Sequence, residues 1–118
     1  MADAYINRGD TLPILQGVLL NPDLSAVDLT DATVQLRLME MATGVITVLP
    51  AIVSGADPTL GLVEHIWAAT ETATSGAYFY KWVVSWPSNT ESFPNDGRGL
   101  VLSIEATVAD YMIAAAAP

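Results

Sequence analysis

Few residues in this chain of 118 could do chemistry, because it has a single histidine and no cysteine. A catalytic base or a metal site at His65 would need partners, and neither a cysteine nor a second histidine can supply one. His65 alternates with Val63 and Trp67 on one face of a short predicted strand. We therefore predict a hydrogen-bonded histidine within the sheet or core, and we expect no catalytic residue, no metal and no cofactor.

Three aspartates, Asp23, Asp28 and Asp31, lie close enough in sequence to suggest calcium binding. Their spacing does not match the calcium-binding loop that closes with a glutamate. Aspartates in such segments commonly accept hydrogen bonds from their own backbone, so we predict turns instead. Arg8-Gly9-Asp10 matches the integrin-binding tripeptide, but so short a match arises often by chance. We expect it to form a turn that leads into the first strand.

An aromatic row marks the longest predicted strand, where Tyr78, Tyr80, Trp82, Val84 and Trp86 share one face. Such a row can stack against sugar rings, as in a carbohydrate-binding module, or it can fill the core of a sandwich. Large side chains on one face of a sandwich strand usually point inward. We therefore place the first four of these residues in the core, together with Trp67, and expect Trp86 to be the most exposed.

Alternation with a period of two runs through most of the chain and predicts strands. Val34, Leu36 and Leu38 indicate a half-buried strand, and residues 45–53 indicate another, in which Pro50 predicts an edge or a bulge. Further strands are expected near residues 12–20, 62–67, 78–86 and 100–108. The pattern predicts an all-β fold, an antiparallel β-sandwich of about seven strands, with a barrel as the competing closure. Residues 1–108 form the expected domain, and residues 109–118 form a C-terminal arm.

The composition argues against several functional classes. Four Lys+Arg and thirteen Asp+Glu give a formal net charge of −9, and so few basic residues cannot cover the phosphates of a nucleic acid. The apolar runs are well below the roughly 20 residues of a membrane-spanning helix, and the first residues do not form a secretory signal. Only 14% of the residues are charged, against 52% hydrophobic, which predicts a surface that a partner covers.

Four segments carry a resemblance to a known family. In chain order they are Arg8–Pro13, Val27–Val34, Glu71–Tyr78 and Ser92–Gly97. Together they resemble the small immunoglobulin-like domain of tailed-bacteriophage virion proteins, which is similar to the N-terminal domain of upper baseplate proteins. The resemblance spans residues 8 to 108, and it departs from the family at Glu71, where an aspartate is usual. It implies that Tyr78 bonds back to upstream backbone as a sandwich corner and that Trp82 is buried.

The resemblance implies an immunoglobulin-like fold and a non-enzymatic, structural role in the virion. The protein would be an accessory subunit: a capsid decoration or cement protein, or an adaptor at the neck, tail or baseplate. Its expected partners are other virion proteins of the capsid, neck or tail, and a homo-oligomer or symmetric array is expected. No contact with nucleic acid or membrane is expected. The alternative function is a carbohydrate-binding module for attachment to the host surface.

Partner contacts are expected at the two ends of the chain, because apolar side chains on short tails serve little purpose unless something covers them. The predicted contact residues are Tyr5, Ile6 and Arg8 at one end, and Tyr111, Met112 and Ile113 at the other.

Overall fold

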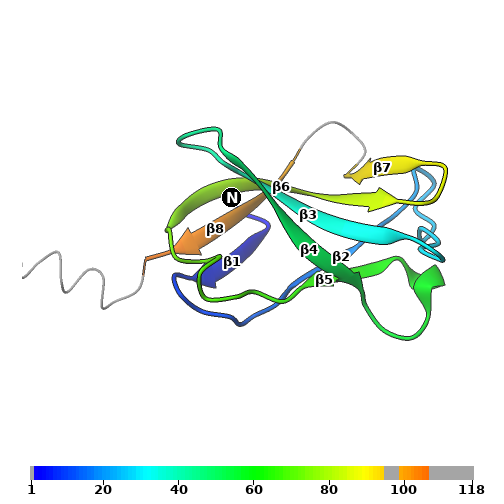
Figure 1. Cartoon of the computed structure of the whole chain (residues 1–118), viewed down its shortest axis with the longest axis horizontal. Coiled ribbons are helices and arrows are strands. Elements are labelled where there is room, and N and C mark those ends of the chain that lie inside the picture. The colour runs from blue at the N-terminus through cyan, green and yellow to red at the C-terminus, as the bar shows by residue number, and fades with distance from the viewer. Residues whose placement is uncertain (1, 95–98, 107–118) are drawn as a thin grey trace, which may run out of the picture.

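A computed structural model describes residues 2–94 and 99–106 of the chain (Figure 1). These residues form eight strands and one short 3₁₀ helix. The strands are β1 (Ala4–Asn7), β2 (Leu15–Val18), β3 (Thr33–Glu40), β4 (Ile46–Val53), β5 (Leu62–His65), β6 (Gly76–Ser85), β7 (Thr90–Phe93) and β8 (Leu100–Glu105), and the 3₁₀ helix η1 spans Pro58–Leu60. None of the helical structure in this described part is long and apolar enough to cross a membrane.

The strands form one sheet in the order β1-β8-β6-β3-β4-β5-β2, with β7 added beside β6. Strand β4 connects the two layers of the sandwich. It pairs with β3 along most of its length, but with β5 only at Ile52 and Val53. The result is a nearly closed, barrel-like sandwich, so the prediction of an all-β sandwich of about seven strands is confirmed. The antiparallel prediction is wrong for one pair, because β1 runs parallel to β8.

Strand β4 shows why a proline is tolerated inside this sheet. Pro50 lies opposite Gln35 of β3, and pairing with β5 begins only at Ile52. A proline has no N–H to donate, so it must face an unpaired side of its strand. The carbonyl of Pro50 faces that side too and accepts a hydrogen bond from the His65 ring. Pro50 therefore lies on a locally unpaired stretch of β4. The prediction of an edge strand is wrong for β4 as a whole, because it lies between β3 and β5 in the sheet.

The core contains each of the five residues that the sequence assigned to it. Trp67, Tyr78, Tyr80, Trp82 and Val84 are all buried, and the Tyr80 and Trp82 rings meet edge to face with centroids 6.4 Å apart. Burial, and then the carboxylate of Asp3, raises the pKa of Tyr80 to about 12, so the phenol stays neutral. Trp86 is only half-buried and packs against the edge of this core, so it is the most exposed member of the row.

The N-terminal segment departs from the sequence prediction. Residues 4–7 form β1, which the sequence pattern did not predict, and β2 is shorter than the expected strand at residues 12–20. Ile6 lies beside Ile104 in the parallel pair and is 3% exposed. Its assignment as a partner contact is therefore wrong, because the chain's own core uses this side chain.

The other predicted contact residues have different environments. Tyr5 points outward and is 54% exposed, whereas the Arg8 backbone is fixed by a hydrogen bond to the Glu105 carbonyl. Tyr111, Met112, Ile113 and the arm at residues 109–118 lie outside the described residues.

Candidate binding surface

The outward side of strands β3, β4 and β6 exposes a row of large apolar side chains. Alternate residues of β3 and β6 are buried, as is Leu49 of β4, so the residues between them must point away from the core. We call this surface the outer face. Its residues are Gln35, Arg37 and Met39 of β3, Ile46, Val48, Pro50 and Ile52 of β4, and Phe79, Lys81 and Val83 of β6.

The outer face exposes large apolar side chains that nothing in the described chain covers. Ile46 is 63% exposed, Val48 51%, Ile52 49% and Phe79 39%. Scattered apolar residues are normal on a protein surface, but a contiguous apolar area of this kind marks an interaction site. Val83 is the exception, because it lies between Gln35 and Ser92 of the neighbouring strands and is buried.

Charge on the outer face is opposite in sign to that of the chain. The face holds Arg37 and Lys81, two of the four Lys+Arg residues, and none of the thirteen Asp+Glu residues. Arg37 and Lys81 lie directly opposite each other in the β3–β6 register. Like charges at directly opposed positions destabilise a sheet, so fold stability does not account for this pair. No ion pair joins either residue to a carboxylate in the described residues.

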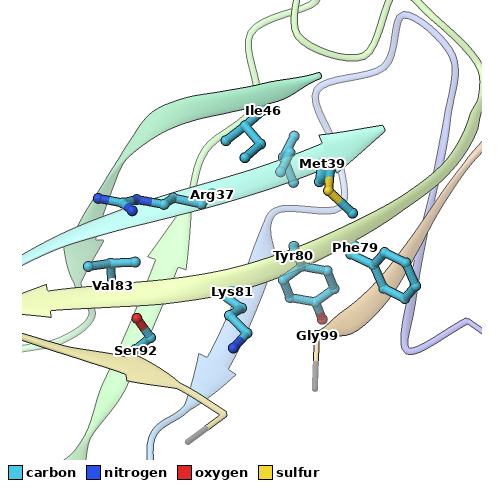
Figure 2. Close-up of a pocket in the computed structure, with 10 residues that line it drawn as sticks. Arg37, Met39, Ile46, Phe79, Tyr80, Lys81, Val83, Ser92 and Gly99 are labelled. Atoms are coloured by element: carbon cyan, nitrogen blue, oxygen red, sulfur yellow. The ribbon is translucent and has the colours of Figure 1, made fainter. Parts of the chain in front are cut away.

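A shallow groove of about 640 Å³ runs over the outer face (Figure 2). Its lining is mostly apolar, with the two cations among the apolar side chains. The lining residues are Arg37, Leu38, Met39, Ile46, Phe79, Tyr80, Lys81, Val83, Ser92 and Gly99. Pockets that bind ligands or peptides commonly combine an apolar lining with a few polar anchors, and this groove has that composition.

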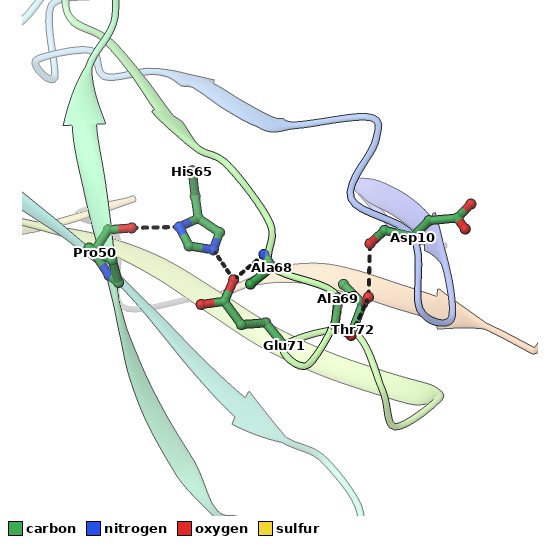
Figure 3. Close-up of polar contacts among 7 residues, drawn as sticks. All are labelled: Asp10, Pro50, His65, Ala68, Ala69, Glu71 and Thr72. Atoms are coloured by element: carbon green, nitrogen blue, oxygen red, sulfur yellow. Dashed lines mark hydrogen bonds and ion pairs between the residues drawn. The ribbon is translucent and has the colours of Figure 1, made fainter.

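The single histidine is buried and makes polar contacts through both ring nitrogens, as the prediction of a hydrogen-bonded histidine within the sheet or core requires (Figure 3). His65 is 2% exposed, its Nδ1 contacts the Pro50 carbonyl, and its Nε2 lies 2.9 Å from Oε1 of Glu71. The same Glu71 oxygen accepts a hydrogen bond of 2.8 Å from the Ala68 N–H. A neutral imidazole has only one N–H, whereas the carbonyl and the carboxylate both accept. The two ring nitrogens of His65 therefore each face an acceptor, which fixes the orientation of the ring.

The corner before β6 has the geometry that the family resemblance implied. The Tyr78 hydroxyl donates a 2.7 Å hydrogen bond to the Thr74 carbonyl four residues upstream. Burial, and then the nearby Glu40 carboxylate, raises the pKa of Tyr78. Thr72 is fully buried and donates to the Asp10 carbonyl, while its own carbonyl accepts from the Gly9 N–H. The Arg8-Gly9-Asp10 segment is thus a turn held by this corner, and it follows β1.

Two of the three aspartates form turns through their own side chains, as predicted, whereas Asp31 lies in a turn with a φ of 61°. Asp23 accepts hydrogen bonds from the backbone and hydroxyl of Ser25, and Asp28 accepts the same pair from Thr30. Asp57 repeats the arrangement with Thr59 and caps η1. In each case the hydroxyl and then the backbone donor lower the aspartate pKa. No group of acidic or histidine side chains suited to a metal ion occurs among the residues that the structure describes.

Sequence reasoning missed the outer face, although one signal for it was present. Residues 45–53 are apolar at nearly every position, so the strand has no polar side. A strand without a polar side is either covered on both faces or exposes an apolar face. Only the register with β3 and β6 settles which applies here and brings Arg37 beside Lys81.

Comparison with known proteins adds no identification. No protein-family model matches the chain, and no curated protein matches it.

Proposed function

We propose that this protein is a non-enzymatic structural subunit of a tailed-phage virion that binds other virion proteins through its outer face. The observation that carries the proposal is the exposed apolar area on β3, β4 and β6, which holds two cations and no carboxylate. Burying apolar surface drives most protein association, and complementary charges set which partner is chosen.

The virion assignment rests on the four ordered segments that resemble the immunoglobulin-like domain of phage virion proteins. The hydrogen bond from Tyr78 to Thr74 supports it, because a tyrosine in this corner position is a recurring device of such sandwiches. Capsids, necks and tails are symmetric, so a weak contact repeated in many copies gains strength through avidity.

The test is incorporation into particles. The chain is quantified by mass spectrometry in particles purified from a producing culture, first as the wild type and then as the variant Ile46→Lys. Ile46 is 63% exposed in the groove, so the substitution should leave the fold intact and reduce incorporation by at least about tenfold.

Ile66→Lys is the matched control. Ile66 is 61% exposed but lies beyond β5, outside the outer face, so this variant should be incorporated normally. Absence of the wild-type chain from particles would refute the virion function. Equal incorporation of the two variants would refute the role of the outer face.

A further inference from the structure

A second surface of the described chain is opposite in charge to the outer face. The segments at residues 19–32 and 54–61 pack together at one end of the sandwich, on the right in Figure 1. The Leu29 N–H donates to the Pro58 carbonyl, and the Leu19 N–H donates to the Gly61 carbonyl. We call these two segments the acidic tip. They carry Asp23, Asp28, Asp31 and Asp57, all exposed, and no lysine or arginine.

The acidic tip also presents an unusual leucine. Leu24 is 76% exposed and has a φ of 70°, in the left-handed region that leucine rarely adopts. Leu20 and Leu60, from the same two segments, are 40% and 50% exposed. An apolar side chain held outward in a strained turn costs free energy in an isolated chain, so its position points to a contact.

We infer that the acidic tip of one copy of this chain docks into the groove on the outer face of a second copy. This inference rests on the proposed use of the outer face as a binding surface. Leu24 would enter the apolar groove beside Met39 and Phe79, and the tip aspartates would approach Arg37 and Lys81. An anionic partner also relieves the repulsion between these two opposed cations.

The charges decide the geometry of the contact. Two outer faces brought together would set cation against cation, and two tips would set aspartate against aspartate, so a face-to-face dimer is disfavoured. A contact between the acidic tip of one copy and the outer face of another instead pairs aspartates with cations and avoids both repulsions. Such a heterologous contact leaves one face and one tip free in every pair, and it builds a ring or a linear array.

The first experiment measures the mass of the full-length chain by light scattering at about 100 µM, a concentration at which weak contacts are populated. The wild type should exceed the monomer mass at low salt and approach it at high salt, because exposed charges are screened. Leu24→Ser should weaken association by about tenfold or more, since it removes the apolar side chain that the contact between copies would bury. Leu12→Ser is the matched control, because Leu12 is 70% exposed but lies outside both surfaces.

The second experiment exchanges charges between the two surfaces. Lys81→Glu on the face and Asp31→Lys on the tip should each abolish association alone. An equimolar mixture should restore it, because each variant then offers the surface that the other requires.

Several results would overturn the inference: a wild-type monomer at every concentration, equal loss in the two leucine variants, or no recovery in the mixture. Loss of association on substituting Tyr111, Met112 and Ile113 but not Leu24 would assign the groove to the C-terminal segment instead. Failure of the proposed self-association can be distinguished from failure of the proposed virion function. A monomeric chain whose Ile46→Lys variant is lost from particles would retain that function, with a different protein in the groove.

Discussion

Substitution of Gly61 tests whether the acidic tip is held in place by the close packing of its two segments. Gly61 ends η1 with a φ of 68°, a conformation that costs a residue with a side chain about 1–2 kcal/mol. A Cβ at this position would lie 2.6 Å from the Leu19 carbonyl oxygen and 3.1 Å from the Val27 nitrogen. Both are backbone atoms, so they cannot move aside as the end of a flexible side chain can.

The expected cost follows from the hydrogen bonds that this contact would disturb. The Leu19 carbonyl accepts from the Val27 N–H at 2.9 Å, and the Gly61 carbonyl accepts from the Leu19 N–H at 2.8 Å. Weakening both costs about 1 kcal/mol each. With the backbone strain, less the stability gained from a less flexible unfolded chain, Gly61→Ala should lower the free energy of unfolding by about 3 kcal/mol.

Gly55→Ala is the matched control, because Gly55 has a φ of 79° and a Cβ there would meet nothing within 4 Å. It carries the same backbone strain and the same change in unfolded-chain entropy, so its cost should stay at about 1 kcal/mol. Urea unfolding followed by the fluorescence of the buried tryptophans measures both variants. Equal losses of stability would refute the packing argument.

Three further predictions concern the polar contacts of the fold. Tyr78→Phe should lower stability by about 1–2 kcal/mol in urea unfolding, because the Thr74 carbonyl loses its donor; an unchanged midpoint would contradict this. Glu71→Gln, whose amide can still pair with His65, should cost less than about 1 kcal/mol, whereas Glu71→Ala should cost about 2 kcal/mol. The folded state lowers the pKa of Asp57, chiefly through a hydroxyl donor, so its carboxylate stabilises the fold above its unfolded pKa. The wild type should therefore be more stable than Asp57→Asn at neutral pH. This difference in stability should disappear as the pH falls through the folded pKa of Asp57, as thermal unfolding in a pH series would measure.

The local sequence pattern was sufficient to predict the strands in which apolar and polar residues alternate regularly. Val34, Leu36 and Leu38 face inward as their spacing predicts, and the aromatic row of β6 is buried with them. Residues 4–7 carry no such signal, because β1 has four residues and only Ile6 is fully buried, with Ala4 packed against the core. A parallel edge strand is fixed by its partner β8, almost a hundred residues away, and no window of local sequence contains that pairing.

The candidate surface depends even more on long-range pairing. Arg37 and Lys81 are far apart in sequence, and only the β3–β6 register makes them neighbours. The turns of Asp23 and Asp28 follow from local chemistry and were predicted, but their joining with the Asp57 turn into one acidic tip depends on the bond from Leu29 to Pro58. Sequence reasoning found the parts of this tip but not the surface that they form together.

Because Lys81 lies opposite Arg37, the variant Lys81→Glu can distinguish a binding role for Lys81 from a role in stabilising the fold. If Lys81 served the fold, Lys81→Glu would lower stability. In the β3–β6 register the new glutamate would instead face Arg37, which turns a repulsive pair into an attractive one. Cross-strand pairs of opposite charge contribute about 0.2–1 kcal/mol, so the free energy of unfolding should rise slightly while association is lost. Binding and stability then move in opposite directions, which a general weakening of the fold cannot produce. A variant that loses both together would mean that Lys81 supports the sheet, and the outer face would lose its strongest argument as a docking surface.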